Sequence, residues 1–186
     1  MGADLFIKPL KVEGFLKNVM QGSRLREFNH DDLEDLKHLI DETVDASYSD
    51  YPEEFREHMK SDHHSRERIL ENSRNGFTLI FELGGRIVGT GTLLGTEIVG
   101  VFVHPSCQRK GFGKSIMLEL EKRALTNGIV TLTLDSTPVS KGFYESLGYI
   151  ISNEALTART NRKFTYYKMK KELKREHSCT KNGKPR

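Results

Sequence analysis

A short segment that contains glycine and basic residues has the residue types to bind phosphate groups. Residues 104–115, HPSCQRKGFGKS, lie between an apolar run and a long helical pattern. Gly111 and Gly113 would let the backbone curl closely around an anion, and a helix start would add free N–H groups and the positive end of its dipole. An ordinary glycine turn before a helix is the alternative. A dinucleotide-binding turn is not indicated, because the pattern G-x-G-x-x-G is missing. Three side chains could add positive charge: Arg109, Lys110 and Lys114.

The hydrophobic pattern predicts the elements that position this segment. Because a helix separates the predicted strands 97–103 and 131–134, these two should be parallel neighbours. The predicted fold is α/β: a mixed, twisted sheet of about six or seven strands with an antiparallel N-terminal meander, a parallel central pair and about four flanking helices. The other strands are expected at 25–28, 77–83, 86–94, 149–152 and 164–169, and the helices at 29–48, after Pro52, from Gly111 to Asn127, and at 139–147.

Two motifs together resemble those of the GNAT superfamily of N-acyltransferases. Residues 108–113, QRKGFG, are similar to the acyl-CoA-binding signature Q/R-x-x-G-x-G/A, and residues 142–149, GFYESLGY, are similar to the second signature F-Y-x-x-x-G-F/Y. The resemblance extends over roughly residues 24–170. It implies the GNAT fold, acetyl-CoA as the acyl donor and cosubstrate, a primary amine as acceptor, and no metal.

The resemblance also implies which residues contact the coenzyme. In this family the strand at 97–103 diverges from its neighbour, so that the backbone of Val101, Phe102 and Val103 can pair with the pantetheine arm. Gly100 in this strand indicates a bulge or a close ligand approach, or else a weakened, tightly packed strand. The pyrophosphate-binding turn and the helix start would be formed by Gln108, Arg109, Lys110, Gly111, Phe112, Gly113, Lys114 and Ser115.

The sequence departs from the family just before the second signature. Many members have an asparagine about seven residues ahead of the signature tyrosine, where this chain has Thr137. Ser140 occupies a position usually given to alanine, and its hydroxyl is a predicted coenzyme contact. Ser136 can supply a further hydroxyl hydrogen bond.

Acylation of an amine needs a proton removed from an ammonium of pKa about 10 and a proton returned to a thiolate of pKa about 8.5. Glu97 precedes Gln108 by eleven residues, which is the spacing of the glutamate base in the histone-acetylating branch of the family. The resemblance therefore implies that Glu97 is a base acting through water, with a surface glutamate as the alternative. Tyr144 matches the general acid of the family, with a purely packing aromatic as the alternative.

Two further parts of the mechanism are expected. The oxyanion should meet a backbone N–H of residues 101–103. Cys107, with His104 nearby, could be a nucleophile in a two-step route, but direct transfer is better supported because no fixed histidine partner is implied.

The acceptor site is the least specified part of the sequence. Tyr48 and Tyr51 are possible pocket residues. The histidines at 58, 63 and 64 are interpreted as solvated, with metal binding as the alternative. Acidic residues in the first helical region could attract a cationic acceptor, or simply form a solvated helix face: Asp41, Glu42, Asp45 and Asp50.

Length and charge favour one domain with extensions: an N-terminal extension at 1–22, the acyl-CoA-binding domain at 23–170 and a basic tail at 171–186. The net charge is +3, and residues 168–186 have eight basic and two acidic residues, hence +6, which leaves −3 elsewhere. Such a charge distribution is not typical of a nucleic-acid-binding domain.

Composition also bears on location and partners. No apolar run reaches the roughly 18 residues of a membrane span. Cys107 and Cys179 lack CxxC spacing, so neither a disulfide nor a zinc site is expected, and a reducing cytoplasm is the simpler inference. The oligomeric state stays open between monomer and homodimer. A non-catalytic acyl-CoA-binding or regulatory module with the same fold is the alternative function.

Overall fold

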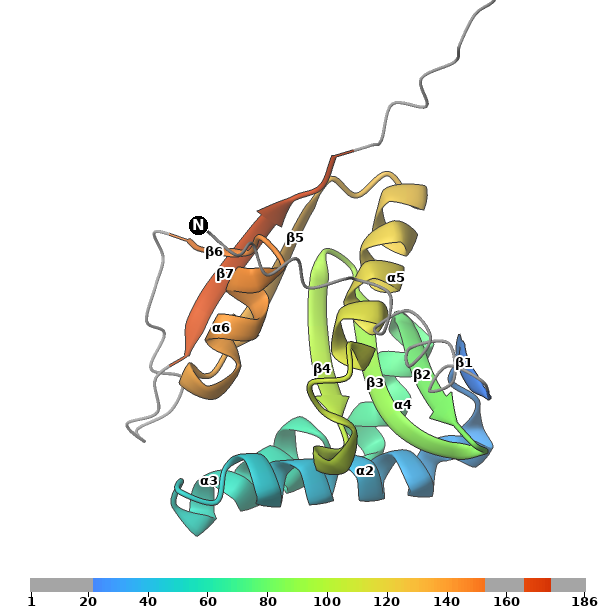
Figure 1. Ribbon diagram of the computed structural model, residues 1–186, viewed down its shortest axis with the longest axis vertical. Helices are drawn as coiled ribbons and strands as arrows, with labels where there is room; N and C mark the ends of the chain where they lie inside the picture. Colours follow the sequence, from blue (N-terminus) through green and yellow to red (C-terminus); the bar gives the residue numbers. More distant parts are fainter. Residues whose placement is uncertain (1–21, 153–165, 175–186) are drawn as a thin grey trace, which may run out of the picture.

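A seven-stranded mixed sheet forms the centre of the computed structural model, which describes residues 22–152 and 166–174 (Figure 1). The strand order is β1-β2-β3-β4-β5-β7-β6, and β4 and β5 form the parallel pair, with all other neighbours antiparallel. This confirms the predicted fold class. The strands are β1 Ser23–Glu27, β2 Phe77–Leu83, β3 Arg86–Leu94, β4 Glu97–Val103, β5 Thr131–Ser136, β6 Ile150–Ile151 and β7 Tyr167–Glu172.

The described residues form five α-helices and three short turns of other helix types. Where one helical region was predicted after Pro52, the structure has two helices separated by a π-helical turn. Within residues 22–152 and 166–174, no helix is long and apolar enough to cross a bilayer. The helices are α2 Leu33–Ser47, α3 Glu53–His58, α4 Arg66–Asn75, α5 Phe112–Thr126 and α6 Pro138–Ser146, with the 3₁₀ turns η2 His30–Asp32 and η4 Pro105–Cys107 and the π turn η3 Met59–His63.

The last strand differs from its prediction. The first residues of the predicted strand 164–169 lie outside the described residues, and β7 continues to Glu172. Leu173 is buried in the core, and its N–H donates to the Val130 carbonyl at 2.7 Å. The folded part therefore extends past residue 170, because this pairing places an apolar residue next to β5.

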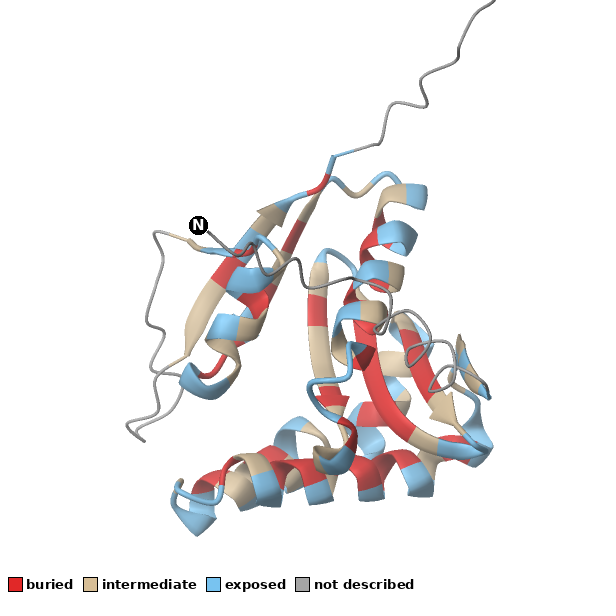
Figure 2. Ribbon diagram, in the orientation of Figure 1, coloured by how far each residue is buried: buried red, intermediate tan, exposed pale blue. Residues whose placement is uncertain are grey.

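Two hydrophobic cores cover the two faces of the sheet (Figure 2). Helices α5 and α6 pack on one face, and α2, α3 and α4 on the other. Strand β2 shows why: Leu79 and Phe81 contact the α5 core, while Ile80 between them contacts the α2 core. A strand buried on both faces needs a continuous apolar run, as residues 77–83 provide.

A bulge in β4 changes which residues face each core. Thr90 pairs with Phe102 and Thr92 with Val99, so that one residue of β3 lies opposite both Gly100 and Val101. Gly100 has φ +62°, a conformation that favours glycine. The extra residue shifts the alternation, so that Ile98 packs in the α5 core and Phe102 in the α2 core. The bulge predicted at Gly100 is confirmed.

The start of α2 is fixed by a polar network around Asp32. The Asn29 side chain accepts a hydrogen bond from the Asp31 N–H at 2.6 Å, and Asp32 accepts one from the Asn29 N–H at 2.8 Å. The Arg26 guanidinium donates to both Asp32 oxygens, at 2.6 and 2.7 Å. These two bonds hold the pKa of Asp32 below its usual value and connect β1 to the helix.

We expect Asp32→Asn to lower the free energy of unfolding by about 2–3 kcal/mol near pH 7, because it leaves Arg26 without its buried carboxylate. The folded pKa is lowered, so the stabilisation is complete above the ordinary pKa of about 3.9 and is lost as the pH falls through the folded value. Urea unfolding at several pH values measures both effects. Asp31→Asn, at an exposed neighbour, should change stability by under about 0.5 kcal/mol, and equal losses in both variants would contradict the assignment.

Candidate active site

A cavity of about 790 Å³ lies at the split between β4 and β5. These two strands form a single residue pair, Glu97 with Thr133, and then diverge (Figure 1). Helices α2, α5 and α6 contribute further walls, together with Met59, His64 and Tyr166. The cavity brings together most of the predicted site residues: Val101, Phe102, Val103, Gln108, Arg109, Gly111, Gly113, Lys114, Ser140 and Tyr144.

The turn between β4 and α5 has the backbone of an anion-binding loop. Arg109 and Gly111 have φ values of +59° and +88°. The first helical hydrogen bond runs from the Ser115 N–H to the Gly111 carbonyl at 3.0 Å, so that the preceding N–H groups of residues 112–114 have no partner in the helix. At Gly113, an added Cβ would lie 3.2 Å from the Phe143 ring, which also lines the cavity. The helix start and a close-packed aromatic ring thus share this corner.

Three predicted contacts do not place their side chains in the cavity. Phe112 is buried in the core, with its ring centre 4.6 Å from that of Phe81. The Lys110 ammonium donates to the Ser106 carbonyl at 2.8 Å, and the Ser115 hydroxyl donates to the Gly111 carbonyl at 3.2 Å. At Lys110, Phe112 and Ser115, only backbone groups are therefore available to a ligand in the cavity. Gln108 lines the cavity and also bonds the Val103 carbonyl at 3.0 Å, which holds the end of β4 against the turn.

Tyr144 brings a buried phenol to the cavity. Its side chain is 7% exposed, and its ring packs on Phe143 with a centroid separation of 5.1 Å. Burial raises the pKa of the Tyr144 phenol, and Tyr48 acts in the same direction. Tyr144 therefore stays protonated near neutral pH and can donate a proton.

Hydroxyl groups connect the end of helix α2 to the start of α6. The Tyr48 hydroxyl and the Thr137 hydroxyl are 3.2 Å apart, and Ser140 lies 3.2 Å from Thr137 and 3.0 Å from Ser136. Burial raises the pKa of Tyr48, whereas its bond to Thr137 lowers it. The residue that replaces the family asparagine thus bonds to protein hydroxyls as well as lining the cavity.

Glu97 lies at the closed end of the split, half-buried beside Thr133. Successive residues of β4 point to opposite faces of the sheet, and Ile98 points to the α5 face. Glu97 therefore points to the α2 face, as Phe102 does after the bulge. Glu97 does not line the cavity. A proton that passes between Glu97 and a group in the cavity has to be carried by water.

His64 contradicts the interpretation of the three histidines as solvated. It lines the cavity, and its ring meets the Phe102 ring edge-on at 4.8 Å. Burial lowers the pKa of His64 to about 3. The prediction was wrong here because the π turn directs this side chain toward β4, which a highly charged sequence does not indicate. His58, in contrast, forms an ion pair with Asp62.

The acidic residues proposed to attract a cationic acceptor do not line the cavity. Asp41 pairs with Lys37, Glu42 lies 3.2 Å from His104, and Asp45 lies 3.0 Å from Lys60. Asp50 is exposed. Among the described residues of the lining, the acidic one is Asp135 on β5.

Two other candidates are separated by the fold. Tyr48 lines the cavity, whereas Tyr51 packs against Phe55 with ring centres 4.8 Å apart. Cys107 is buried outside the lining, and its sulfur lies 3.7 Å from the Ser106 hydroxyl. This placement gives no support to a cysteine nucleophile.

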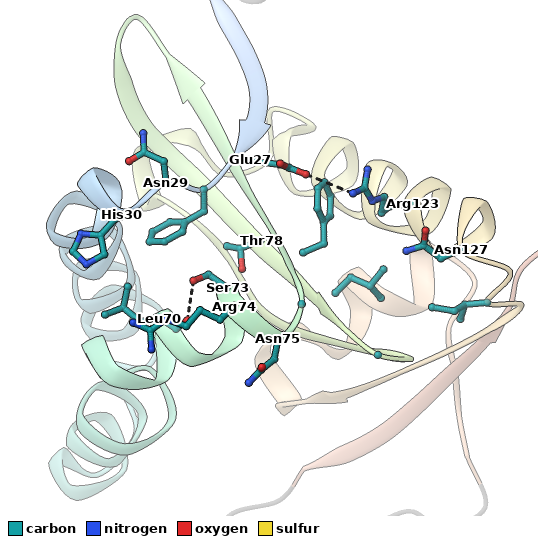
Figure 3. Close-up of a pocket in the computed structure, with 16 residues that line it drawn as sticks. Glu27, Asn29, His30, Leu70, Ser73, Arg74, Asn75, Thr78, Arg123 and Asn127 are labelled. Atoms are coloured by element: carbon teal, nitrogen blue, oxygen red, sulfur yellow. Dashed lines mark hydrogen bonds and ion pairs between the residues drawn. The ribbon is translucent and has the colours of Figure 1, made fainter.

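A second cavity, of about 610 Å³, lies near the C-terminal ends of α4 and α5 (Figure 3). Glu27 and Arg123 form an ion pair in its wall at 3.6 Å (Figure 3), and the Arg123 guanidinium stacks over the Phe77 ring at 4.3 Å. None of the predicted site residues lines this cavity. The chemistry indicated by the sequence therefore gathers at the β4–β5 split.

The class of protein that this fold and cavity define is an acetyltransferase. Residues 35–173 match the family model described as Acetyltransferase (GNAT) domain, and the chain belongs to the GNAT acetyltransferase family. The chain is also similar to solved structures. One is a GCN5-related N-acetyltransferase from Rhodopseudomonas palustris, with 26% identity, a TM-score of 0.74, and coverage of 83% of this chain and 98% of that one.

Another similar structure is the PaiA N-acetyltransferase from Thermoplasma acidophilum in complex with coenzyme A, with 21% identity, a TM-score of 0.71, and coverage of 81% of this chain and 99% of that one. At this identity the likeness concerns the fold. A curated relative is glucosamine 6-phosphate N-acetyltransferase from Trypanosoma brucei brucei, 36% identical over 69 residues. That match covers 37% of this chain and 42% of the relative, less than half of its length.

Proposed function

We propose that this chain transfers the acetyl group of acetyl-CoA directly to a primary amine. The observation that carries the proposal is the position of the buried Tyr144 phenol in the same cavity as the Gly111 turn. A pyrophosphate would be bound by the backbone N–H groups at the start of α5, with Arg109 and Lys114 adding charge from the lining. The exposed edge of β4 would then pair with the extended arm of the donor.

The reaction follows from the groups around the split. The amine nitrogen attacks the thioester carbon, and the oxyanion is stabilised by a backbone N–H of β4. The bulge supports this role, because Gly100 and Val101 share one opposing residue and cannot both pair with β3. Tyr144 protonates the thiolate as the carbon–sulfur bond breaks, and the proton lost by nitrogen leaves through water, with Glu97 as its acceptor.

A panel of amines with acetyl-CoA, monitored by release of free thiol, tests the proposal. Acetylation of at least one amine, with loss in Tyr144→Phe, is the expected result. The competing function is a non-catalytic acyl-CoA-binding module. If coenzyme A binds and every amine in a broad panel is left unmodified, that function replaces acetyl transfer.

We expect Glu97→Gln to lower kcat/KM by about tenfold near neutral pH, because an amide cannot accept a proton. Steady-state kinetics near pH 7 measures the effect. Glu119→Gln on α5, which lies outside the cavity, is the matched control and should behave as the wild type. An unchanged rate in Glu97→Gln would remove Glu97 from the mechanism.

A further inference from the structure

His64 is a titratable side chain in the cavity that the proposed mechanism leaves without a role. It follows the π turn η3, and its N–H donates to the Met59 carbonyl at 3.0 Å. Its Cε1 and Nδ1 atoms lie 3.5 and 3.6 Å from the point that a Cβ on Gly100 would occupy. The imidazole therefore covers the bulge of β4 on the face toward α2. Single π turns often occur at functional sites.

The ring nitrogens of His64 are free to meet a ligand. Within the described part of the chain, no hydrogen bond or ion pair reaches them. The other histidines of this region differ: His58 pairs with Asp62, and His104 bonds Ser106 at 2.8 Å and Glu42 at 3.2 Å. A neutral imidazole has one nitrogen that accepts a hydrogen bond, so a ligand in the cavity can donate one to His64.

The surroundings of His64 disfavour positive charge. Burial is the main cause of its lowered pKa, and the charges of His63 on its own turn and Lys37 on α2 act in the same direction. Lys37 is itself paired with Asp41. From β4 the ring meets Gly100 and Phe102, which have no charge. The imidazole is neutral near pH 7, and an ammonium placed beside it would meet the same penalty.

The cavity that His64 lines offers hydrogen-bonding groups and little negative charge. Hydroxyl, thioether and aromatic side chains line it, among them Thr43, Ser47, Tyr48, Met59 and Tyr166. Its charged lining residues in the described part of the chain are the basic Arg109 and Lys114 and the exposed Asp135 on β5. Two cations and one exposed carboxylate do not favour a further positive charge in the cavity.

We propose that the His64 imidazole binds the uncharged form of the acceptor amine by accepting a hydrogen bond from the N–H of that amine. The acceptors are then amines of low pKa, such as α-amino groups. This inference rests on the proposed acetyl transfer. The bonded amine directs its lone pair at the thioester carbon. The carbon–nitrogen bond forms, the carbon–sulfur bond breaks, and sulfur takes the Tyr144 proton. The surplus proton on nitrogen passes through water to Glu97, which releases it to solvent, and Tyr144 is reprotonated from solvent.

The substrate class follows from the protonation of the free amine. An α-amino group has a pKa of about 7.8 and a lysine-type alkyl amine one of about 10.4, so that near pH 7 the uncharged fractions differ by a few hundredfold. If a site excludes the ammonium form, its kcat/KM for an amine follows the uncharged fraction of that amine. If a site binds the ammonium beside a carboxylate, its kcat/KM does not depend on this fraction in the same way.

Kinetics with two acceptors of similar size tests the inference: alaninamide, an α-amine, and isopropylamine, an alkyl amine. We expect kcat/KM for alaninamide to exceed that for isopropylamine by on the order of a hundredfold near pH 7, with a gap that narrows as the pH rises. His64→Phe should raise the KM for alaninamide at least about tenfold and leave the dissociation constant of coenzyme A unchanged. His64→Gln, which retains a hydrogen-bond acceptor, should recover part of the loss. His58→Gln is the matched control and should behave as the wild type.

A second measurement does not depend on turnover. In the full chain loaded with coenzyme A, imidazole nitrogen NMR signals of His64 should shift on addition of alaninamide near pH 7, and those of His58 should not. If no amine is acetylated but this shift occurs, acetyl transfer is wrong and the amine site stands. If alaninamide is acetylated but the His64 signals do not move and His64→Phe keeps its KM, the inference is overturned. A preference for isopropylamine would overturn the substrate class.

Discussion

Tyr144→Phe is expected to lower kcat by about 10²–10⁴-fold in an assay limited by the chemical step. The phenol is buried in the cavity and its pKa is raised, so that it is a protonated donor in the proposed binding cavity of the thioester. Phenylalanine retains the ring contacts with Phe143 and Tyr149, so the dissociation constant of coenzyme A should change by less than about twofold. Stopped-flow or quenched single turnovers would separate the chemical step from product release.

Tyr149 offers a matched control for this experiment. Its ring centre lies 6.1 Å from that of Tyr144, and its buried hydroxyl interacts with Glu121 without a hydrogen bond of good geometry in the described part of the chain. Tyr149 does not line the cavity. Tyr149→Phe should therefore retain kcat and change stability by less than about 1 kcal/mol, because no well-formed hydrogen bond is lost. Full turnover by Tyr144→Phe in a chemistry-limited assay would show that Tyr144 only packs.

Gly111→Val is expected to weaken coenzyme A binding by roughly 10–100-fold. Gly111 has φ +88°, and no atom lies within 4 Å of an added Cβ, so that the effect arises from the backbone and not from a clash. A valine costs at least about 1–2 kcal/mol in this conformation and would move the turn out of it, together with the free N–H groups at the start of α5. Isothermal titration calorimetry measures the change.

The opposite end of the same helix provides the control. Gly128 follows α5 with φ +79° and has equally open surroundings, but it lies outside the cavity. Gly128→Val should lose a similar amount of unfolding free energy and retain coenzyme A binding. Lys110→Ala should weaken binding by less than about threefold, because its ammonium is directed at the Ser106 carbonyl. Binding that depends on Lys110 more than on Gly111 would show that side-chain charge, not the backbone, holds the phosphates.

Local signals in the sequence predicted the meander and the turn well. The bounds of β2, β3 and β4 agree with the predicted strands 77–83, 86–94 and 97–103, because the apolar runs are interrupted by glycine turns with positive φ at Gly84, Gly85 and Gly95. Gly100 predicted the bulge for the same reason, since only a few residue types adopt its conformation. These features depend on neighbours in the chain.

Features that depend on tertiary contacts could not be predicted in this way. The apolar positions Phe55, Met59 and Ile69 predict a helical region, but they do not predict the π turn inside it. The direction of the His64 side chain depends on that turn and could therefore not be predicted. Tyr48 and Tyr51 have the same residue type three positions apart, and packing on α3 and α6 decides which of them reaches the cavity. Glu97 has the spacing of a base, yet its distance from the cavity depends on where β5 leaves β4.

The single residue pair between β4 and β5 has a consequence for how the molecule holds together. Backbone pairing divides the sheet into a four-stranded and a three-stranded part, and side chains of α5 such as Ile116 and Leu120 pack in the core that spans both. On the other face, the Tyr48 and Thr137 hydroxyls are in hydrogen-bond contact and Phe55 packs against Tyr166. Cohesion across the split therefore depends on side chains more than on backbone pairing. A donor molecule bound along β4 would fill the split between the two parts of the sheet. We therefore expect the whole sheet to unfold more cooperatively in the complex than in the free chain.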